Sequence, residues 1–165
     1  MGMTCGLQRV SNAQIEELLE APQNLEEEAD FLDESSHDNT TYLDKAWHGI
    51  HFLLTGLAWG GEEPLCYLLV GGESLNNGDG GGWSRILRPA QIASFDEALQ
   101  KISTENFRER FAPQRMIEEE IYPTIWDCDP RDNDTLSYLA DYFEELKNFV
   151  HLAHENNQGL IIFIG

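Results

Sequence analysis

Positive charge is scarce in this sequence, and the shortage excludes two classes of partner. Ten Lys and Arg residues stand against 30 Asp and Glu residues, which gives a formal net charge of -20 at pH 7. Nucleic-acid binding depends on basic side chains that neutralise phosphates, and peripheral binding to anionic membranes depends on them as well. We therefore expect neither nucleic acid nor a membrane as a partner.

Cysteine is also sparse, and long apolar runs are missing. Cys5, Cys66 and Cys128 form no C-x-x-C pair of the kind that binds zinc or acts as a redox dithiol, so we expect reduced, buried thiols. The sequence has no apolar stretch of about 18 residues, and its start lacks the charged and apolar segments of a signal peptide. These absences predict a cytoplasmic location.

The apolar residues that are present suffice for one folded domain. The chain has 165 residues, of which 41% are hydrophobic, so it is not a disordered acidic tail. Residues 3–10 and 83–87 have strand patterns, and 160–164 is a continuous apolar run that is typical of a covered central strand. We expect a single α+β domain over residues 1–165, in which five to six helices pack on a small mixed sheet.

Helical periodicity is clearest over residues 42–55, where apolar residues recur every three or four positions and Gly56 marks the end. Ser11 and Gln14 predict a capping box at the start of an earlier helix. Further helices are expected near a capping box of Ser94 and Glu97, after Thr104, after Pro113, and over about 135–154 behind Asp134.

Three segments are expected to be irregular. Residues 22–41 are acidic and predict a surface excursion, residues 71–82 are rich in glycine and predict a mobile loop, and residues 123–134 are rich in aspartate. The apolar run 65–70 is too short to assign by its period, although a helix is favoured there.

Several sequence strings occur in an order shared with a known family. They are an MGM start, YLDKAWHGIHFLLTG at 42–56, FRERF at 107–111, EIYP at 120–123 and the apolar end at 160–165. On these strings the chain resembles the YfbM-like family of bacterial proteins, catalogued as a domain of unknown function, over essentially its full length. The resemblance implies a single α+β domain and brings no catalytic or binding residues with it.

Asp44, His48 and His51 lie at i, i+4 and i+7 of the predicted helix, within about 60° of one another around its axis. A carboxylate with two imidazoles could bind zinc or iron, or act as an oriented acid–base pair. The alternative is a surface contact between Asp44 and His48, with His51 at the edge of the core beside Trp47. We expect no metal and no cofactor, because two-histidine helical sites favour i,i+4 spacing and these histidines are i,i+3.

Tyr122 and Trp126 allow two interpretations. Exposed aromatic residues beside acidic ones would form a protein-binding patch, whereas buried ones would plug the core where a helix meets a loop. Other reaction machinery is missing from the sequence. The aspartate-rich loop lacks the EF-hand Gly and Glu, the glycine-rich loop lacks the P-loop lysine, no nucleophile elbow is present, and Glu118–Glu120 show no specific spacing for a glycosidase pair.

The charge pattern favours a non-enzymatic protein-binding module whose acidic face docks a basic protein, in the way that immunity proteins neutralise a toxin or nuclease. The alternative is a small-molecule-binding protein or hydrolase-type enzyme with a pocket near the 44–51 helix and the Tyr122–Trp126 loop. Its candidate residues are Trp47, His48, His51, Tyr122 and Trp126. The sequence leaves the oligomeric state open.

The metal hypothesis has a direct test. Protein purified without a histidine tag is expected to carry less than about a tenth of an equivalent of zinc or iron, because the histidine spacing does not match a helical metal site. Elemental analysis measures the metal content, and a stoichiometric metal that disappears on replacing His48 would contradict the expectation.

Overall fold

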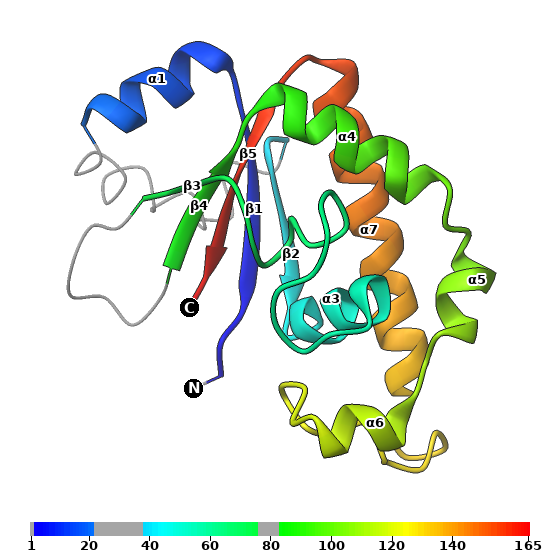
Figure 1. Cartoon of the computed structure of the whole chain (residues 1–165). Coiled ribbons are helices and arrows are strands. Elements are labelled where there is room, and N and C mark those ends of the chain that lie inside the picture. Colours follow the sequence, from blue (N-terminus) through cyan, green and yellow to red (C-terminus); the bar gives the residue numbers. More distant parts are fainter. Residues whose placement is uncertain (1, 22–37, 76–82) are drawn as a thin grey trace.

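Figure 1 shows the computed structural model, which describes residues 2–21, 38–75 and 83–165. Within these ranges five strands form one sheet and six helices pack around it. The elements are β1 (Cys5–Val10), α1 (Asn12–Glu20), β2 (Thr40–Asp44), α3 (Trp47–Thr55), β3 (Glu73–Ser74), β4 (Trp83–Leu87), α4 (Pro89–Gln100), α5 (Thr104–Glu109), α6 (Pro113–Glu118), α7 (Thr135–Glu155) and β5 (Gly159–Ile164). Most of the expected acidic excursion and glycine-rich loop lies outside the described residues.

The last strand, β5, is the centre of the sheet. The strand order is β2-β1-β5-β4-β3, so β5 pairs with the first strand on one side and with β4 on the other. The two ends of the chain lie side by side, where the Thr4 amide donates to the Gly165 carbonyl over 2.8 Å. Every strand pair is antiparallel. The α+β class is therefore confirmed, whereas the expected mixed sheet is wrong, because residue patterns do not encode strand direction.

Helices cover both faces of the sheet, but unequally. In Figure 1, α1 lies on one side of the sheet and α3, α4 and α7 lie on the other. Along β5, Leu160 and Ile162 belong to the larger core beneath the three helices, whereas Ile161 packs with Ile15 of α1. The central strand is apolar on both faces for this reason, as its sequence predicted. Among the described helices, none combines the length and apolar character that a bilayer crossing requires.

The helix expected over residues 42–55 begins five residues later. Residues 40–44 form β2, and Asp44 turns the chain with a φ of 46° before α3 starts at Trp47. The apolar period misled here because Leu43 is buried from the strand, at a position that also fits the helical stripe. The end of α3 is as predicted, with Gly56 at a φ of 76°.

Local capping signals were correct in some places and displaced in others. Ser11 and Gln14 form the predicted capping box, and Asp134 caps α7 by accepting from the Ser137 amide over 3.0 Å. Ser94 caps nothing, because α4 already starts at Pro89, a favoured first-turn residue. The N-cap of α5 is the residue before Thr104, and residues 65–70 form consecutive turns instead of a helix.

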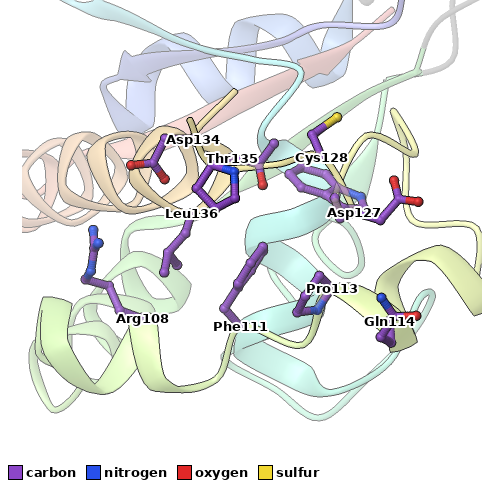
Figure 2. Close-up of a pocket in the computed structure, with 11 residues that line it drawn as sticks. Arg108, Phe111, Pro113, Gln114, Asp127, Cys128, Asp134, Thr135 and Leu136 are labelled. Atoms are coloured by element: carbon purple, nitrogen blue, oxygen red, sulfur yellow. The ribbon is translucent and has the colours of Figure 1, made fainter. Parts of the chain in front are cut away.

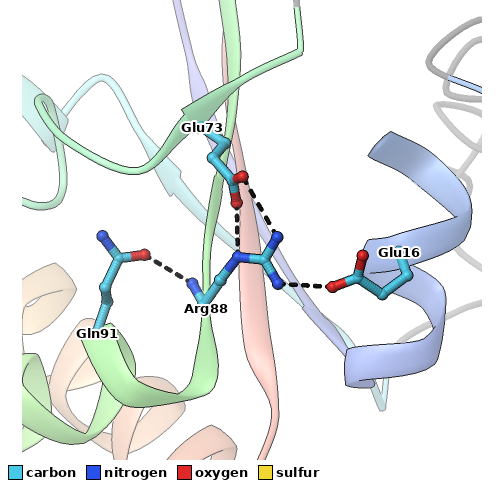
Figure 3. A network of polar contacts seen from close by, with 4 residues as sticks. All are labelled: Glu16, Glu73, Arg88 and Gln91. Atoms are coloured by element: carbon cyan, nitrogen blue, oxygen red, sulfur yellow. Dashed lines mark hydrogen bonds and ion pairs between the residues drawn. The ribbon is translucent and has the colours of Figure 1, made fainter. Parts of the chain in front are cut away.

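Arg88 connects three elements on the α1 side of the sheet (Figure 3). Its Nε donates to Glu73 of β3 over 2.8 Å, and its Nη1 donates to Glu16 of α1 over 2.7 Å. Its backbone amide donates to the side chain of Gln91, which closes the first turn of α4. The two carboxylates raise the pKa of Arg88, so it stays charged and the three elements remain tied.

Arg85 of β4 is buried and bonds to backbone instead of carboxylates. Its guanidinium donates to the carbonyls of Gly71, Tyr67 and Leu68 over 2.7, 3.0 and 2.6 Å. Burial lowers its pKa to about 10, and no carboxylate pairs with it within the described residues. This side chain therefore anchors the turn segment 62–72 to the sheet.

Replacing the buried guanidinium of Arg85 should weaken the attachment of segment 62–72 to the sheet. Arg85→Met is expected to lower the free energy of unfolding by about 2–4 kcal/mol, because three carbonyls lose a charged donor. Urea denaturation at neutral pH measures the change. Arg131→Met is the matched control, since Arg131 is exposed and pairs with Asp129 alone; equal losses in both variants would contradict the anchoring role.

Candidate functional site

An aromatic cluster surrounds the first turn of α3. Trp47 is fully buried, and its ring stacks on His48 at 5.0 Å and on Tyr122 at 5.7 Å between centroids. Trp59, from the loop after α3, lies 4.6 Å from the His48 ring. These four side chains thus meet although they come from α3, from the loop directly after it and from the segment around residue 122.

Both ring nitrogens of His48 are occupied by backbone. Nδ1 accepts from the Tyr122 amide over 2.9 Å, which leaves Nε2 to donate to the Ala58 carbonyl over 2.8 Å. Burial lowers the pKa of His48, so the neutral form that makes both bonds is favoured. A general base needs a nitrogen free to take a proton from a substrate, and His48 has none.

His51 is buried more deeply than expected. Its side chain is fully inaccessible, and neither ring nitrogen makes a hydrogen bond of normal geometry within the described residues. Burial, followed by the neighbouring His48, lowers its pKa to about 4, and the Gly60 backbone partly opposes the shift. His51 is therefore a neutral core residue at physiological pH.

Asp44 does not share a helix face with the histidines. It ends β2, where its carboxylate accepts from the Tyr138 hydroxyl over 2.8 Å, and this hydroxyl accepts from the Lys45 amide over 3.1 Å. Burial and the Asp44 contact raise the pKa of Tyr138. The arrangement of Asp44, His48 and His51 predicted from a continuous helix is wrong, because the helix starts after Asp44. Within the described ranges no three His, Cys, Asp or Glu side chains group as metal ligands do.

Trp126 is a core residue. Only 1% of it is exposed, and its indole donates to the Ile121 carbonyl over 2.7 Å. A β carbon at Gly49 would lie 3.0 Å from the indole ring, so α3 packs closely on it. Tyr122 is half-buried. The candidate residues thus converge, but as packed interior; the interpretation of an exposed Trp126 patch is wrong.

A pocket opens beside Trp126 (Figure 2). It has a volume of about 520 Å³ and is lined by residues of α5, α6, the 126–134 loop and the start of α7. Phe111, with Trp126 and Leu136, gives it apolar walls, and we call it the Phe111 pocket. Cys128 stands at its rim and is exposed, unlike the buried Cys5 and Cys66, which corrects the expectation of three buried thiols.

A second feature is the Trp59 loop, which we define as residues 56–61. Leu57 is 49% exposed and Trp59 is 58% exposed. A groove of about 600 Å³ adjoins the loop at Leu57 and Gly61, and Thr55 and Glu62 line it as well. Leu57 lies where the helical stripe of 42–55 would continue, but the left-handed turn at Gly56 directs the chain away from the core.

Sequence reasoning missed both features. The Phe111 pocket draws on four segments that only the fold brings together, and no local spacing marks them. A signal for the Trp59 loop was present, since Trp59 follows the Gly56 helix stop and precedes two further glycines.

Comparison with known proteins gives a family and a fold. Residues 1–163 match a family described as a domain of unknown function, DUF1877. Protein YfbM of Escherichia coli (strain K12) is 24% identical over 174 residues, covering 100% of both chains. The crystal structure of YfbM from Escherichia coli, described as a protein of unknown function, is similar with a TM-score of 0.73 and 22% identity, covering 98% of this chain and 99% of that chain.

The buried histidines should make stability depend on pH. A folded-state pKa of about 4 for His51, against 6.5 when unfolded, means that its contribution is full above about pH 6.5 and is lost as the pH falls toward 4. The free energy of unfolding is expected to fall by about 2 kcal/mol between about pH 7 and pH 5 from His51 alone. Urea titrations at both pH values measure it.

Variants separate this effect from titration of the carboxylates. His51→Gln should remove most of the difference between the two pH values, whereas His154→Gln should leave it intact because His154 is exposed on α7. Identical pH slopes in wild type and His51→Gln would count against a neutral buried His51.

Proposed function

The chain belongs to the DUF1877 family, whose function is unknown, and from its own surface we propose that it is a non-enzymatic protein-binding module for a basic partner. Neutralisation of a basic toxin or nuclease, as immunity proteins perform it, is the specific form of this proposal. The observation that carries it is the exposed Trp59 loop, which adjoins a groove lined by Glu62, on a chain with a net charge of -20.

The negative charge cannot be neutralised within the chain. Thirty carboxylate residues face ten cations, and some of these cations are used elsewhere. Arg85 bonds three backbone carbonyls, and Lys147 donates to the Ile102 carbonyl over 2.9 Å. The resulting negative potential attracts a basic protein and raises its association rate, more strongly at low salt.

The Trp59 loop supplies short-range contacts that charge alone does not give. Trp59 rests on the buried His48 ring, and Gly61 lies so close to Thr55 that a β carbon there would be 2.9 Å from Thr55 Cγ2. Exposed tryptophan held in place by its own protein is typical of interface hot spots. Glu62 lines the adjoining groove, which favours a partner with a basic side chain next to an apolar one.

The candidate residues near α3 support binding over catalysis. Both nitrogens of His48 hold backbone groups, and Trp47 and Trp126 are buried. A hydrolase at this place would need a titratable group that faces solvent or substrate. The cluster instead supports the Trp59 loop from beneath.

The proposal is tested by affinity capture from the source cell at about 50 and about 300 mM salt. We expect recovery of a basic protein that falls by about tenfold or more at the higher salt, because attraction between exposed charges is screened. The association rate of the recovered partner, measured by surface plasmon resonance, should fall in parallel. Partners whose recovery is indifferent to salt would argue against the proposal.

Substitutions locate the contact. Trp59→Ala is expected to reduce the affinity of the recovered partner by about tenfold or more, as removal of a tryptophan hot spot does. Leu152→Ala is the matched control, since Leu152 is an exposed apolar residue on α7, 41% exposed. Equal losses in the two variants would remove the Trp59 loop from the interface.

A further inference from the structure

The Phe111 pocket has the size and lining of a small-ligand site. Its volume of about 520 Å³ lies within the range of about 300–1,000 Å³ that such sites occupy. Phe111, Trp126 and Leu136 provide apolar surface. Phe111 lies between α5 and α6, Trp126 lies in the loop before α7, and Leu136 lies in the first turn of α7. The pocket contains no residue of the Trp59 loop, so the proposed partner binding gives the pocket no role.

The polar side chains that line the pocket include Thr135, Arg108, Asp127 and Gln114. Thr135 is only 4% exposed, yet its hydroxyl lines the pocket. The Arg108 guanidinium and the Asp127 carboxylate stand at the rim. In the part of the chain that the structure describes, none of these side chains makes a hydrogen bond or a close ion pair, although Arg108 interacts electrostatically with Asp134. The Thr135 hydroxyl is therefore available to hydrogen-bond a ligand or water in the pocket.

Asp134 has a different role. One carboxylate oxygen accepts from the Ser137 amide over 3.0 Å and the other accepts from the Ser137 hydroxyl over 2.8 Å, so the group is used in capping α7. Asp134 keeps its negative charge and interacts electrostatically with Arg108. The charged side chains of the lining that make no hydrogen bond within the described residues are Arg108 and Asp127.

These two charges lie at opposite ends of the pocket. Figure 2 shows Arg108 beside Asp134 at one end and Asp127 at the other, with Phe111 and Thr135 between them. We propose that the Phe111 pocket binds a short peptide with free termini, its carboxylate at Arg108 and its ammonium at Asp127. Thr135 would then hydrogen-bond a peptide group, and an apolar side chain of the ligand would lie on Phe111.

The chemistry of the lining selects this ligand class over simpler ones. A guanidinium binds a carboxylate through two parallel hydrogen bonds, whereas a purely anionic ligand would be repelled by Asp127, Asp134 and the net charge of -20. A purely cationic ligand would meet Arg108. In a free amino acid both charges are attached to one carbon, whereas a di- or tripeptide separates them, as Arg108 and Asp127 are separated in the pocket.

Trileucine with free termini is a suitable probe, with its N-acetylated and C-amidated forms as matched ligands. Titration calorimetry is expected to give binding that weakens by about fivefold or more when either terminus is blocked, because each block removes one charge-assisted contact. Cys128 gives a second readout: trileucine should slow its alkylation by iodoacetamide, while the buried Cys5 and Cys66 remain unreactive. Equal binding of all three peptides, or no binding at about 10 mM, would overturn the proposal.

Two variants test whether the carboxylate of the peptide binds at Arg108 and its ammonium at Asp127. Arg108→Gln should abolish the difference between free and amidated peptide, and Asp127→Asn should abolish the difference between free and acetylated peptide. Arg131→Gln is the control, because Arg131 is exposed and lies outside the pocket lining. The opposite assignment, or unchanged preferences in both variants, would contradict the orientation. None of these outcomes bears on salt-dependent capture of a basic partner, so the two proposals fail separately.

Discussion

The imidazole of His48 joins α3 and the loop directly after it to the Tyr122 segment, which is 74 residues away in the sequence. One ring nitrogen accepts from the Tyr122 backbone, the other donates to the Ala58 backbone, and the ring lies between Trp47 and Trp59. Protonation would cost one of the two backbone bonds, and burial already disfavours it. This one neutral side chain therefore bonds both the Trp59 loop and the segment that leads to Trp126 and the Phe111 pocket.

The charges of the protein are divided between interior and surface. The scarce cations have structural tasks: Arg85 holds the turn segment on β4, and Arg88 ties α1 to β3 and α4. The 30 acidic residues outnumber the ten basic ones, so most of the negative charge has no cation of the same chain to balance it. This excess of negative charge is the basis for proposing a basic protein as partner, and for proposing that the ligand of the Phe111 pocket carries balanced charge.

Local signals predicted the elements that depend on neighbours in sequence. The Ser11 capping box, the Asp134 cap and the Gly56 helix end are all present, because each is formed by residues within one turn. Predictions failed where a residue fits both a helical and a strand period, or where pairing between strands decides which structure forms. Leu43 fitted a helical stripe but is buried from β2, a strand that exists only because β1 lies beside it.

The sequence by itself determined the excess of negative charge, the α+β class, and a covered central strand at 160–164, because composition and short-range period carry that information. It also placed Tyr122 and Trp126 among the residues near α3. Only the tertiary structure decided that Asp44 stands apart from the histidines and that Arg108, Asp127 and Thr135 share one pocket. Such groups meet through packing between separate helices and loops, and no spacing along the chain records which faces will come into contact.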